Sequence, residues 1–523
     1  MARAAGGAVG APREQWTGQV GFIISAIGSA VGLGNIWRFP GVAYENGGGA
    51  FLVPYIVALL TAGIPILFLD YAIGHRFRGS APRSFRRLGG RPLEALGWFQ
   101  AAIAFVISLY YTAVIAWAAS YFVFSFDLRW GDDPGGFFTG EFLQTSDPGF
   151  SLDFVPGVLI PLALVWIATL AVLAAGVAKG LQRLNTFALP LLFVGFIVLV
   201  VRALFLPGAE VGLNALFTPE WSALADPAVW MAAYSQIFFS LSIAFGIMVT
   251  YSSYRARRSN LTGPGLVVAF ANSSFEILAG IGVFATLGFF AVQQGVGIDE
   301  LEGLTGVGLS FITFPAIVAQ MPGGPVFGAL FFGSLAIAGF TSLVSVLQVV
   351  SAAVQEKFGL TRLQATLSIG GAAAVLSVLL FATTNGLNAL DVVDNWANNV
   401  GVMASAVLTT VLVLWVRRRG EELRRHLNAV STFQVGRVWT ALVGAVVPVV
   451  LGAILVTGVV SLVVDGYDVY DRGFLGLFGW GTIVAVVLLT LVLTALPWRR
   501  DPDAFTPWPT LPPARSAQQG ARR

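Results

Sequence analysis

Two polar stretches inside otherwise apolar segments carry the residues best suited to bind an ion or a small molecule. One is GSAVGLGNIWRFP at residues 28–40, and the other is QIFFSLSIAFG at residues 236–246. Both are runs of the kind that interrupt a helix. An interrupted helix offers free N–H groups and a positive dipole end to a carboxylate, and free carbonyls to a hard cation. The first stretch alone is also compatible with close helix packing through Gly32 and Gly34, but two breaks predict a repeated architecture with a binding site between them.

Other kinds of chemistry lack the side chains they need. The 523 residues include no Cys and two His, His75 and His426. Disulfides, zinc sites, thiolate nucleophiles and bis-His haem ligation are therefore excluded. The net charge of +3 does not indicate nucleic-acid binding, because Lys and Arg in such an apolar chain mainly mark the cytoplasmic loops.

The elements that must position the two stretches are membrane-spanning helices. Hydrophobic residues make up 56% of the chain and charged residues 11%, whereas about a quarter of a soluble domain is charged. About 20 apolar residues cross a bilayer as a helix. Twelve candidate spans follow, at residues 18–43, 50–74, 96–126, 155–176, 186–206, 229–254, 266–294, 325–355, 364–384, 390–416, 439–464 and 473–497.

Charge in the loops predicts the orientation. With both termini cytoplasmic, 26 of the 30 Lys and Arg fall on the inside, and the other four are Arg38, Arg129, Arg202 and Arg472. This bias follows the positive-inside rule. The first span lacks a small-residue cleavage site and is expected to be a retained helix rather than a signal peptide. The Pro-rich tail at 499–523 is expected to be disordered.

Several motifs resemble those of one transporter family. They are REQW at 13–16, AVGLGNIWRFP at 30–40, ENGGGAF at 45–51, GIPILFLDYAIG at 63–74, QIFFSLS at 236–242 and AGFTS at 338–342. The sequence is identified by them as a member of the neurotransmitter:sodium symporter family, which includes the bacterial leucine transporter.

The resemblance implies the fold and its divisions. The expected fold is an all-helical membrane protein of twelve spans with discontinuous first and sixth helices. It divides into a cytoplasmic tail at 1–15, two inverted repeats at 16–206 and 207–416, two further spans at 417–498, and the tail at 499–523.

The resemblance also implies two sodium sites. The first uses the Ala30 carbonyl, the side chains of Asn35, Ser240 and Asn272, and the substrate carboxylate. The second uses the carbonyls of Gly28, Val31 and Ala338 with the hydroxyls of Thr341 and Ser342. Hard cations take such neutral and anionic oxygens. For Asn35 and Asn272, the residues alone indicate an interhelical hydrogen bond equally well.

The same comparison implies an amino-acid site. The substrate carboxylate is expected on the amides of Leu33 and Gly34 and the hydroxyl of Tyr111, with Ser240 nearby. The side-chain pocket is expected to be lined by Ile107, Phe239, Ser242, Phe245, Ser342 and Val346. None of these carries a charge, and an unpaired buried charge is costly, so a neutral, apolar amino acid is expected. Ala244 stands where many relatives have Gly, and its methyl group is expected to narrow the pocket toward small or medium substrates.

Two acids, Asp70 and Glu276, lie deep inside spans, where carboxylates indicate function. Glu276 follows Asn272 by four residues and shares its helix face. Bacterial members of the family often have Glu here while animal members bind chloride, so transport is expected to be chloride-independent, with Glu276 able to protonate on the return step. Asp70 replaces the usual Glu, and whether its shorter side chain reaches the 236–246 break is left open.

Gates are expected on both sides of the site. The outer gate pairs Arg38 with Asp394, with Gln236 nearby, and the inner gate pairs Arg13 with Glu356 beside Trp16 and Tyr254. Exposed ion pairs are worth about 0 to 1 kcal/mol, so such gates open and close readily.

These features together predict a symporter in the inner membrane of a prokaryote that couples the influx of two sodium ions to uptake of a neutral amino acid by alternating access. Its partners are the substrate and the lipid bilayer, and a homodimer is left open. The alternatives are a proton-coupled carrier of the same fold and a transport-inactive nutrient sensor. A channel would show a charge ring and an enzyme a catalytic cluster, and the sequence indicates neither.

Overall fold

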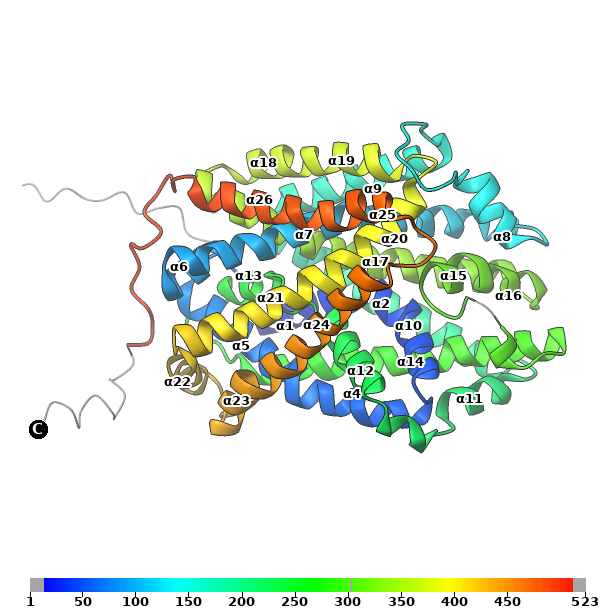
Figure 1. Ribbon diagram of the computed structural model, residues 1–523, viewed down its shortest axis with the longest axis horizontal. Helices are drawn as coiled ribbons and strands as arrows, with labels where there is room; N and C mark the ends of the chain where they lie inside the picture. Colours follow the sequence, from blue (N-terminus) through cyan, green and yellow to red (C-terminus); the bar gives the residue numbers. More distant parts are fainter. Residues whose placement is uncertain (1–13, 302, 511–523) are drawn as a thin grey trace, which may run out of the picture.

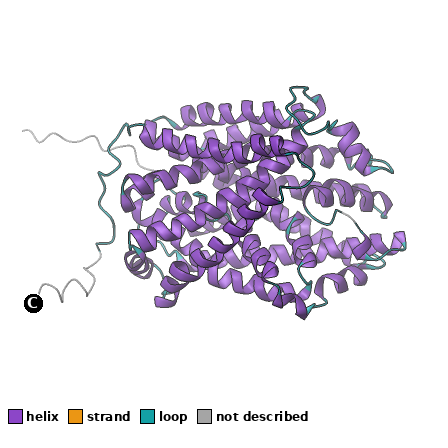
Figure 2. Ribbon diagram, viewed as in Figure 1, coloured by secondary structure: helices purple, strands orange, loops and turns teal. Residues whose placement is uncertain are grey.

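Helices form the regular architecture of the computed structural model, which describes residues 14–301 and 303–510 (Figure 2). Ten helices in this described part are long and apolar enough to cross a membrane. They are Gly49–Phe77 (α4 and α5), Arg91–Phe124 (α7), Pro156–Ala175 (α9), Val177–Leu204 (which includes α10, Arg183–Leu204), Thr262–Gln294 (α14), Gly324–Phe358 (α17), Arg362–Phe381 (α18 and α19), Gly386–Val416 (which includes α20, Gly386–Asn395, and α21, Met403–Thr410), Arg437–Val464 (α23 and α24) and Arg472–Ala495 (α25 and α26).

The remaining two expected spans are the interrupted ones. The first consists of α1 (Gln19–Ala30) and the helical stretch Leu33–Glu45 (α2 and α3), which are bent by 55° at the break. The second consists of α12 (Pro227–Ser240) and α13 (Ile247–Ser253), separated by residues 241–246. The expected all-helical, multi-spanning fold with a broken helix near the N-terminus is confirmed.

Short helices connect the spans at both ends of the bundle (Figure 1). They are α6 (Ala81–Gly89), α8 (Pro134–Gly136), α11 (Ala209–Phe217), α15 (Gly306–Gly308), α16 (Phe314–Gln320) and α22 (Gly420–Val430).

Burial separates inner helices from outer ones. In their most apolar windows, 83% of α7 and 72% of α14 and α17 are buried inside the protein, against 22% of the span Arg437–Val464. α7 and α17 pack along one another. The interrupted helices lie against this inner group, because α1 packs on both α14 and α17.

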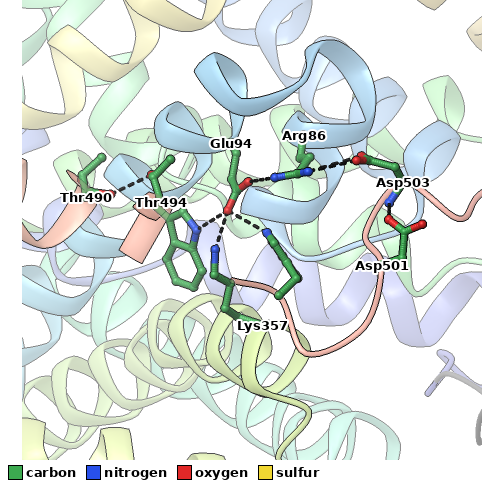
Figure 3. A network of polar contacts seen from close by, with 9 residues as sticks. Arg86, Glu94, Lys357, Thr490, Thr494, Asp501 and Asp503 are labelled. Carbon is green, nitrogen blue, oxygen red and sulfur yellow. Dashed lines mark hydrogen bonds and ion pairs between the residues drawn. The ribbon is translucent and has the colours of Figure 1, made fainter. Parts of the chain in front are cut away.

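A buried ion pair fixes the start of α7 to the end of α17 (Figure 3). Lys357 Nζ lies 2.7 Å from Glu94 Oε1, and both side chains are fully buried. Arg86 in α6 binds the other oxygen of Glu94 at 2.7 Å and also pairs with Asp503 at 3.0 Å. The four charges therefore join two inner helices, a connecting helix and the C-terminal segment.

The C-terminal segment is ordered where the structure describes it. Trp498 Nε1 donates to Glu94 at 2.7 Å, and Arg87 stacks over the Phe505 ring at 4.3 Å. Within 499–510, Asp503 and Phe505 thus contact Arg86 and Arg87 of α6, and disorder of the tail as a whole stays a prediction. Residues 511–523 lie outside the described part.

Candidate functional site

A cavity of ≈ 50 Å³ lies between the two helix breaks. It is lined by Ala30, Gly32, Gly34, Asn35, Ile107, Tyr110, Tyr111, Phe239, Ser240, Ser242, Phe245, Ser342, Val346, Asn398 and Val402. No side chain in this lining is charged. The structure thus brings together most residues expected for an amino-acid pocket, from α1, α2, α7, α12 and α17.

The break between α1 and α2 leaves backbone groups that local side chains satisfy. The Gly32 N–H donates to Asn35 Oδ1 at 2.8 Å, and the Leu33 N–H donates to the Tyr111 hydroxyl at 3.1 Å. Gly34 lets Phe239 approach, because a Cβ there would overlap the Phe239 ring. A carboxylate near Leu33 would therefore meet an amide and a hydroxyl that already face each other.

The break between α12 and α13 is held in an unusual backbone conformation. Ser242, Ala244 and Gly246 have φ of 53°, 67° and 86°, a left-handed region that costs non-glycine residues energy. Ser405 donates to the Ala244 carbonyl, and Asp70 Oδ2 accepts from the Ala244 N–H at 3.2 Å. Asp70 does reach the break despite its shorter side chain.

Ala244 does not line the cavity itself. It is fully buried, whereas its neighbour Phe245 is part of the lining. The Ala244 backbone, with a φ of 67°, is held between Asp70 and Ser405. Phe239, Phe245, Ile107 and Val346 are among the residues that bound the space, and the preference for small or medium substrates stays a prediction.

Three side chains expected at the first sodium site form a continuous hydrogen-bonded chain. Asn35 Nδ2 donates to Asn272 Oδ1 at 2.8 Å, and Asn272 Nδ2 donates to Ser240 Oγ at 3.0 Å. All three are buried, and Ala30 lines the same cavity. The chain ties α2, α14 and α12 at the level of both breaks.

Glu276 lies next to this chain, on the same face of α14. Tyr55 donates to its Oε2, and Gln236 Nε2 donates to its Oε1 at 2.7 Å. The carboxyl group is fully buried. Gln236, expected beside the outer gate, is a hydrogen-bond partner of Glu276.

The hydroxyls expected at the second sodium site lie on α17 beside α1. Ser342 Oγ donates to the Ser29 carbonyl at 3.1 Å, and Thr341 Oγ1 donates to the Ala338 carbonyl at 3.0 Å. Ser242 also donates to the Ser29 carbonyl, at 2.9 Å. One carbonyl of α1 thus accepts hydrogen bonds from a hydroxyl of α17 and from a hydroxyl of the second break. Gly28 packs against Asn185 of α10, because a Cβ there would overlap the Asn185 side chain.

The outer pair expected between Arg38 and Asp394 is not closed. In the described part of the chain the two make no ion pair within 4.0 Å; Arg38 lies over the Phe239 ring, 4.8 Å from its centroid. Asp394 Oδ1 accepts from Asn398 Nδ2 at 2.8 Å. In this conformation Arg38 contacts an aromatic face and Asp394 an amide.

Trp16 packs edge-on against the rings of Tyr251 and Tyr254 at the end of α13. Trp16 Nε1 donates to the Tyr251 carbonyl at 2.8 Å, and the Trp16 N–H donates to the Tyr254 carbonyl at 3.3 Å. Glu356 Oε2 accepts from the backbone N–H and the hydroxyl of Ser80, both at 2.9 Å. Its expected partner, Arg13, lies outside the described residues.

Sequence reasoning missed five residues of the site: Ser29, Tyr55, Tyr110, Asn398 and Val402. Ser29 falls within the polar stretch at 28–40, and Tyr110 adjoins Tyr111, so position could have indicated both. The others follow from packing alone. The rings of His75 and His426 are hydrogen-bonded to one another, with 3.0 Å between Nδ1 of His75 and Nε2 of His426. Neither residue lines the cavity.

Known proteins are similar to this chain in sequence and in fold. The profile of the Sodium:neurotransmitter symporter family matches residues 13–133 and 132–500. A sodium-dependent transporter of Methanocaldococcus jannaschii is 38% identical over 92% of this chain and 97% of its own. The sodium- and chloride-dependent creatine transporter 1 of Homo sapiens is 32% identical over 77% of this chain and 70% of its own. The crystal structure of MhsT in complex with L-phenylalanine is similar with a TM-score of 0.73 and 33% identity, over 86% of this chain and 100% of that chain.

Proposed function

This chain belongs to the sodium:neurotransmitter symporter family of sodium-dependent, multi-pass membrane transporters, and we propose that its substrate is a neutral, apolar amino acid moved by alternating access. The observation that carries the proposal is the uncharged cavity between two helix breaks. An amino-acid side chain with a net charge would find no counter-ion there. MhsT, whose structure holds L-phenylalanine, supports an amino acid rather than another solute.

The substrate carboxylate is proposed to bind at the first break. The Leu33 amide and the Tyr111 hydroxyl are 3.1 Å apart and face one another, and Gly34 lines the cavity beside them. A carboxylate accepts from both an N–H and an O–H group, and bonds to a charged acceptor are stronger than neutral ones. Binding would replace one neutral hydrogen bond by two charge-assisted ones.

The first sodium ion is proposed to bind among Ala30, Asn35, Ser240 and Asn272. Their neutral oxygens are of the type a hard cation takes, and three of the side chains already converge through bonds of 2.8 and 3.0 Å. The substrate carboxylate would complete the set and link sodium binding to substrate binding.

The second sodium ion is proposed to bind between α1 and α17. Its donors are the carbonyls of Gly28, Val31 and Ala338 and the hydroxyls of Thr341 and Ser342. Both hydroxyls now donate to carbonyls, at 3.0 and 3.1 Å, and would turn their lone pairs to a bound cation. Each sodium ion moving inward gains about 2.3 kcal/mol per 100 mV.

Transport is proposed to be independent of chloride. Glu276 is buried beside the first proposed sodium site, where Tyr55 and Gln236 hold both of its oxygens. A carboxylate in this place supplies the negative charge that a bound chloride would otherwise supply. Protonation of Glu276 on the return step would let the empty transporter reorient.

The chain is proposed to consist of two inverted repeats at 16–206 and 207–416, with 417–498 outside them. The first, second, sixth and seventh spans would rock against the third, fourth, eighth and ninth, which are formed by α7, α9, α17 and the pair α18 and α19. Arg38 and Asp394 would close the outer side. Both termini are proposed to face the cytoplasm of a prokaryotic cell.

Equilibrium binding tests the proposal. Purified protein is offered radiolabelled alanine, leucine, phenylalanine, lysine and glutamate in sodium chloride and in choline chloride. Saturable binding of a neutral amino acid in sodium only is expected. Binding of lysine or glutamate in preference to all neutral amino acids would overturn the proposed substrate class.

A further inference from the structure

A groove on the outside of the bundle combines an apolar wall with two cations at one end. It has a volume of ≈ 530 Å³ and is formed by the span Pro156–Ala175 (α9), the span Val177–Leu204 and α17. Its lining residues are Ala171, Val172, Ala175, Lys179, Gly180, Arg183, Leu184, Phe187, Ala188, Leu191 and Ile337. The two cations lie where the two outer spans join, and apolar side chains line the rest.

The residues of the second span follow one stripe. Lys179, Arg183, Phe187 and Leu191 are each four residues apart, so they share one helix face. At 1.5 Å per residue the stripe from Lys179 to Leu191 is about 18 Å long, close to the roughly 15 Å of one leaflet's hydrocarbon layer. The groove therefore runs from the membrane surface toward its middle.

Small residues give the groove its depth. Ala171 and Ala175 form one wall, and Gly180 and Ala188 lie beside the stripe. Phe187 and Leu191 are 68% and 61% exposed, so the protein leaves this apolar surface to the surrounding hydrocarbon. The dimensions suit one acyl chain.

Lys179 and Arg183 are the two charged residues of the groove lining. In the described part of the chain neither Lys179 nor Arg183 forms an ion pair, and both are exposed. Glu14, a carboxylate at this end of the span, is engaged by Arg362 at 2.5 Å and by the Val177 N–H at 3.3 Å. The end of the groove therefore carries net positive charge facing the lipid headgroups.

We propose that this groove binds an anionic glycerophospholipid, with its phosphate between Lys179 and Arg183 and one acyl chain along Phe187 and Leu191. Basic residues near an anionic surface are each worth about 1 kcal/mol. Cations at span ends meet headgroups in general, but here they are continuous with a groove that accepts the chain of the same molecule.

The groove also adjoins the first broken helix. Gln182, one residue before Arg183, accepts from the Thr17 N–H at 3.1 Å. Asn185, two residues after Arg183, packs against Gly28. A lipid in the groove thus contacts the same two turns that support α1.

Native mass spectrometry of the full-length, delipidated protein in detergent tests the proposal. The probes are dioleoylphosphatidylglycerol, dioleoylphosphatidylcholine and sn-glycerol 3-phosphate, which has the phosphate but no chains. We expect preferential binding of phosphatidylglycerol and no competition by glycerol 3-phosphate. The double variant Lys179→Gln with Arg183→Gln should bind phosphatidylglycerol about 30-fold more weakly, from two charges at about 1 kcal/mol each.

A second variant tests the groove without touching its charges. Ala175→Leu places a larger apolar side chain in the groove and should also weaken phosphatidylglycerol binding. If the double variant fails to fold, this variant alone tests whether the lipid binds in the groove. Arg437→Gln and Ala441→Leu make the same changes at an exposed cation and an exposed alanine of another span, and should leave binding unchanged. Equal binding by the groove variants and their controls, or full competition by glycerol 3-phosphate, would overturn the proposal.

Discussion

Asn35 in α2 donates a 2.8 Å hydrogen bond to the side-chain oxygen of Asn272 in α14. This bond joins the outer half of a broken helix to a continuous inner helix, beside the cavity. Asn272 in turn donates a 3.0 Å hydrogen bond to Ser240 Oγ. Ser240 is the last residue of α12, directly before the second break. A cation bound here would act on both breaks at once.

Asn272→Ala should therefore weaken sodium binding. It removes a proposed ligand and leaves the Asn35 side chain without its acceptor. We expect the sodium concentration that supports half-maximal substrate binding to rise at least about tenfold, since loss of even an indirect ligand contact costs about 10- to 100-fold. Asn214→Ala, at an exposed position of α11, is the control. An unchanged sodium dependence in Asn272→Ala would remove this residue from the site.

Chloride replacement tests the role of Glu276. Substituting gluconate for chloride should leave sodium-dependent uptake unchanged, because the Glu276 carboxylate already provides the negative charge. Glu276→Gln keeps the shape but loses that charge, and should reduce uptake in gluconate. Loss of wild-type uptake in gluconate would show that this chain needs chloride, as the name of the human creatine transporter states for that relative.

Tyr111→Phe should weaken substrate binding. It deletes the hydroxyl that now accepts from the Leu33 N–H at 3.1 Å. A hydrogen bond to a charged group contributes about 1.5 to 3 kcal/mol, so the Kd of the preferred amino acid should rise roughly 10- to 150-fold. Tyr44→Phe removes a hydroxyl outside the cavity lining and should not change it. The measurement is equilibrium binding, and equal affinities for the two variants would contradict the proposed carboxylate site.

The buried pair of Glu94 and Lys357 should matter for stability. Lys357→Met leaves a fully buried carboxylate short of one partner, and breaking a buried pair costs about 3 to 5 kcal/mol. The melting temperature in detergent should fall clearly, while Arg472→Met at an exposed cation should not lower it. Glu94→Gln combined with Lys357→Met should be less destabilising than the two single losses added together, and strict additivity would argue against a direct interaction.

The sequence predicted the membrane architecture well because long apolar runs and loop charges leave few alternatives. It also placed both breaks, since Gly32 and Gly246 lie in the stretches that unwind. Residues inside quoted motifs, such as Asn35 and Ser240, were found where they were expected to lie together.

What failed depends on tertiary packing. The left-handed backbone at Ala244 is one that no local pattern reveals. Tyr55 and Asn398 reach the site from distant elements, and the hydrogen bond from Gln236 to Glu276 joins two different helices. The contacts of the C-terminal segment depend on Glu94 and Arg86, more than 400 residues earlier in the chain.

Uptake into proteoliposomes tests the central claim most directly. Purified protein is reconstituted and offered each amino acid in turn, with an inward sodium gradient, with sodium equal on both sides, and with an inward proton gradient and no sodium. We predict that at least one neutral amino acid accumulates above its external concentration only with the sodium gradient. Accumulation driven by protons without sodium, or no sodium-dependent uptake of any amino acid, would contradict the account.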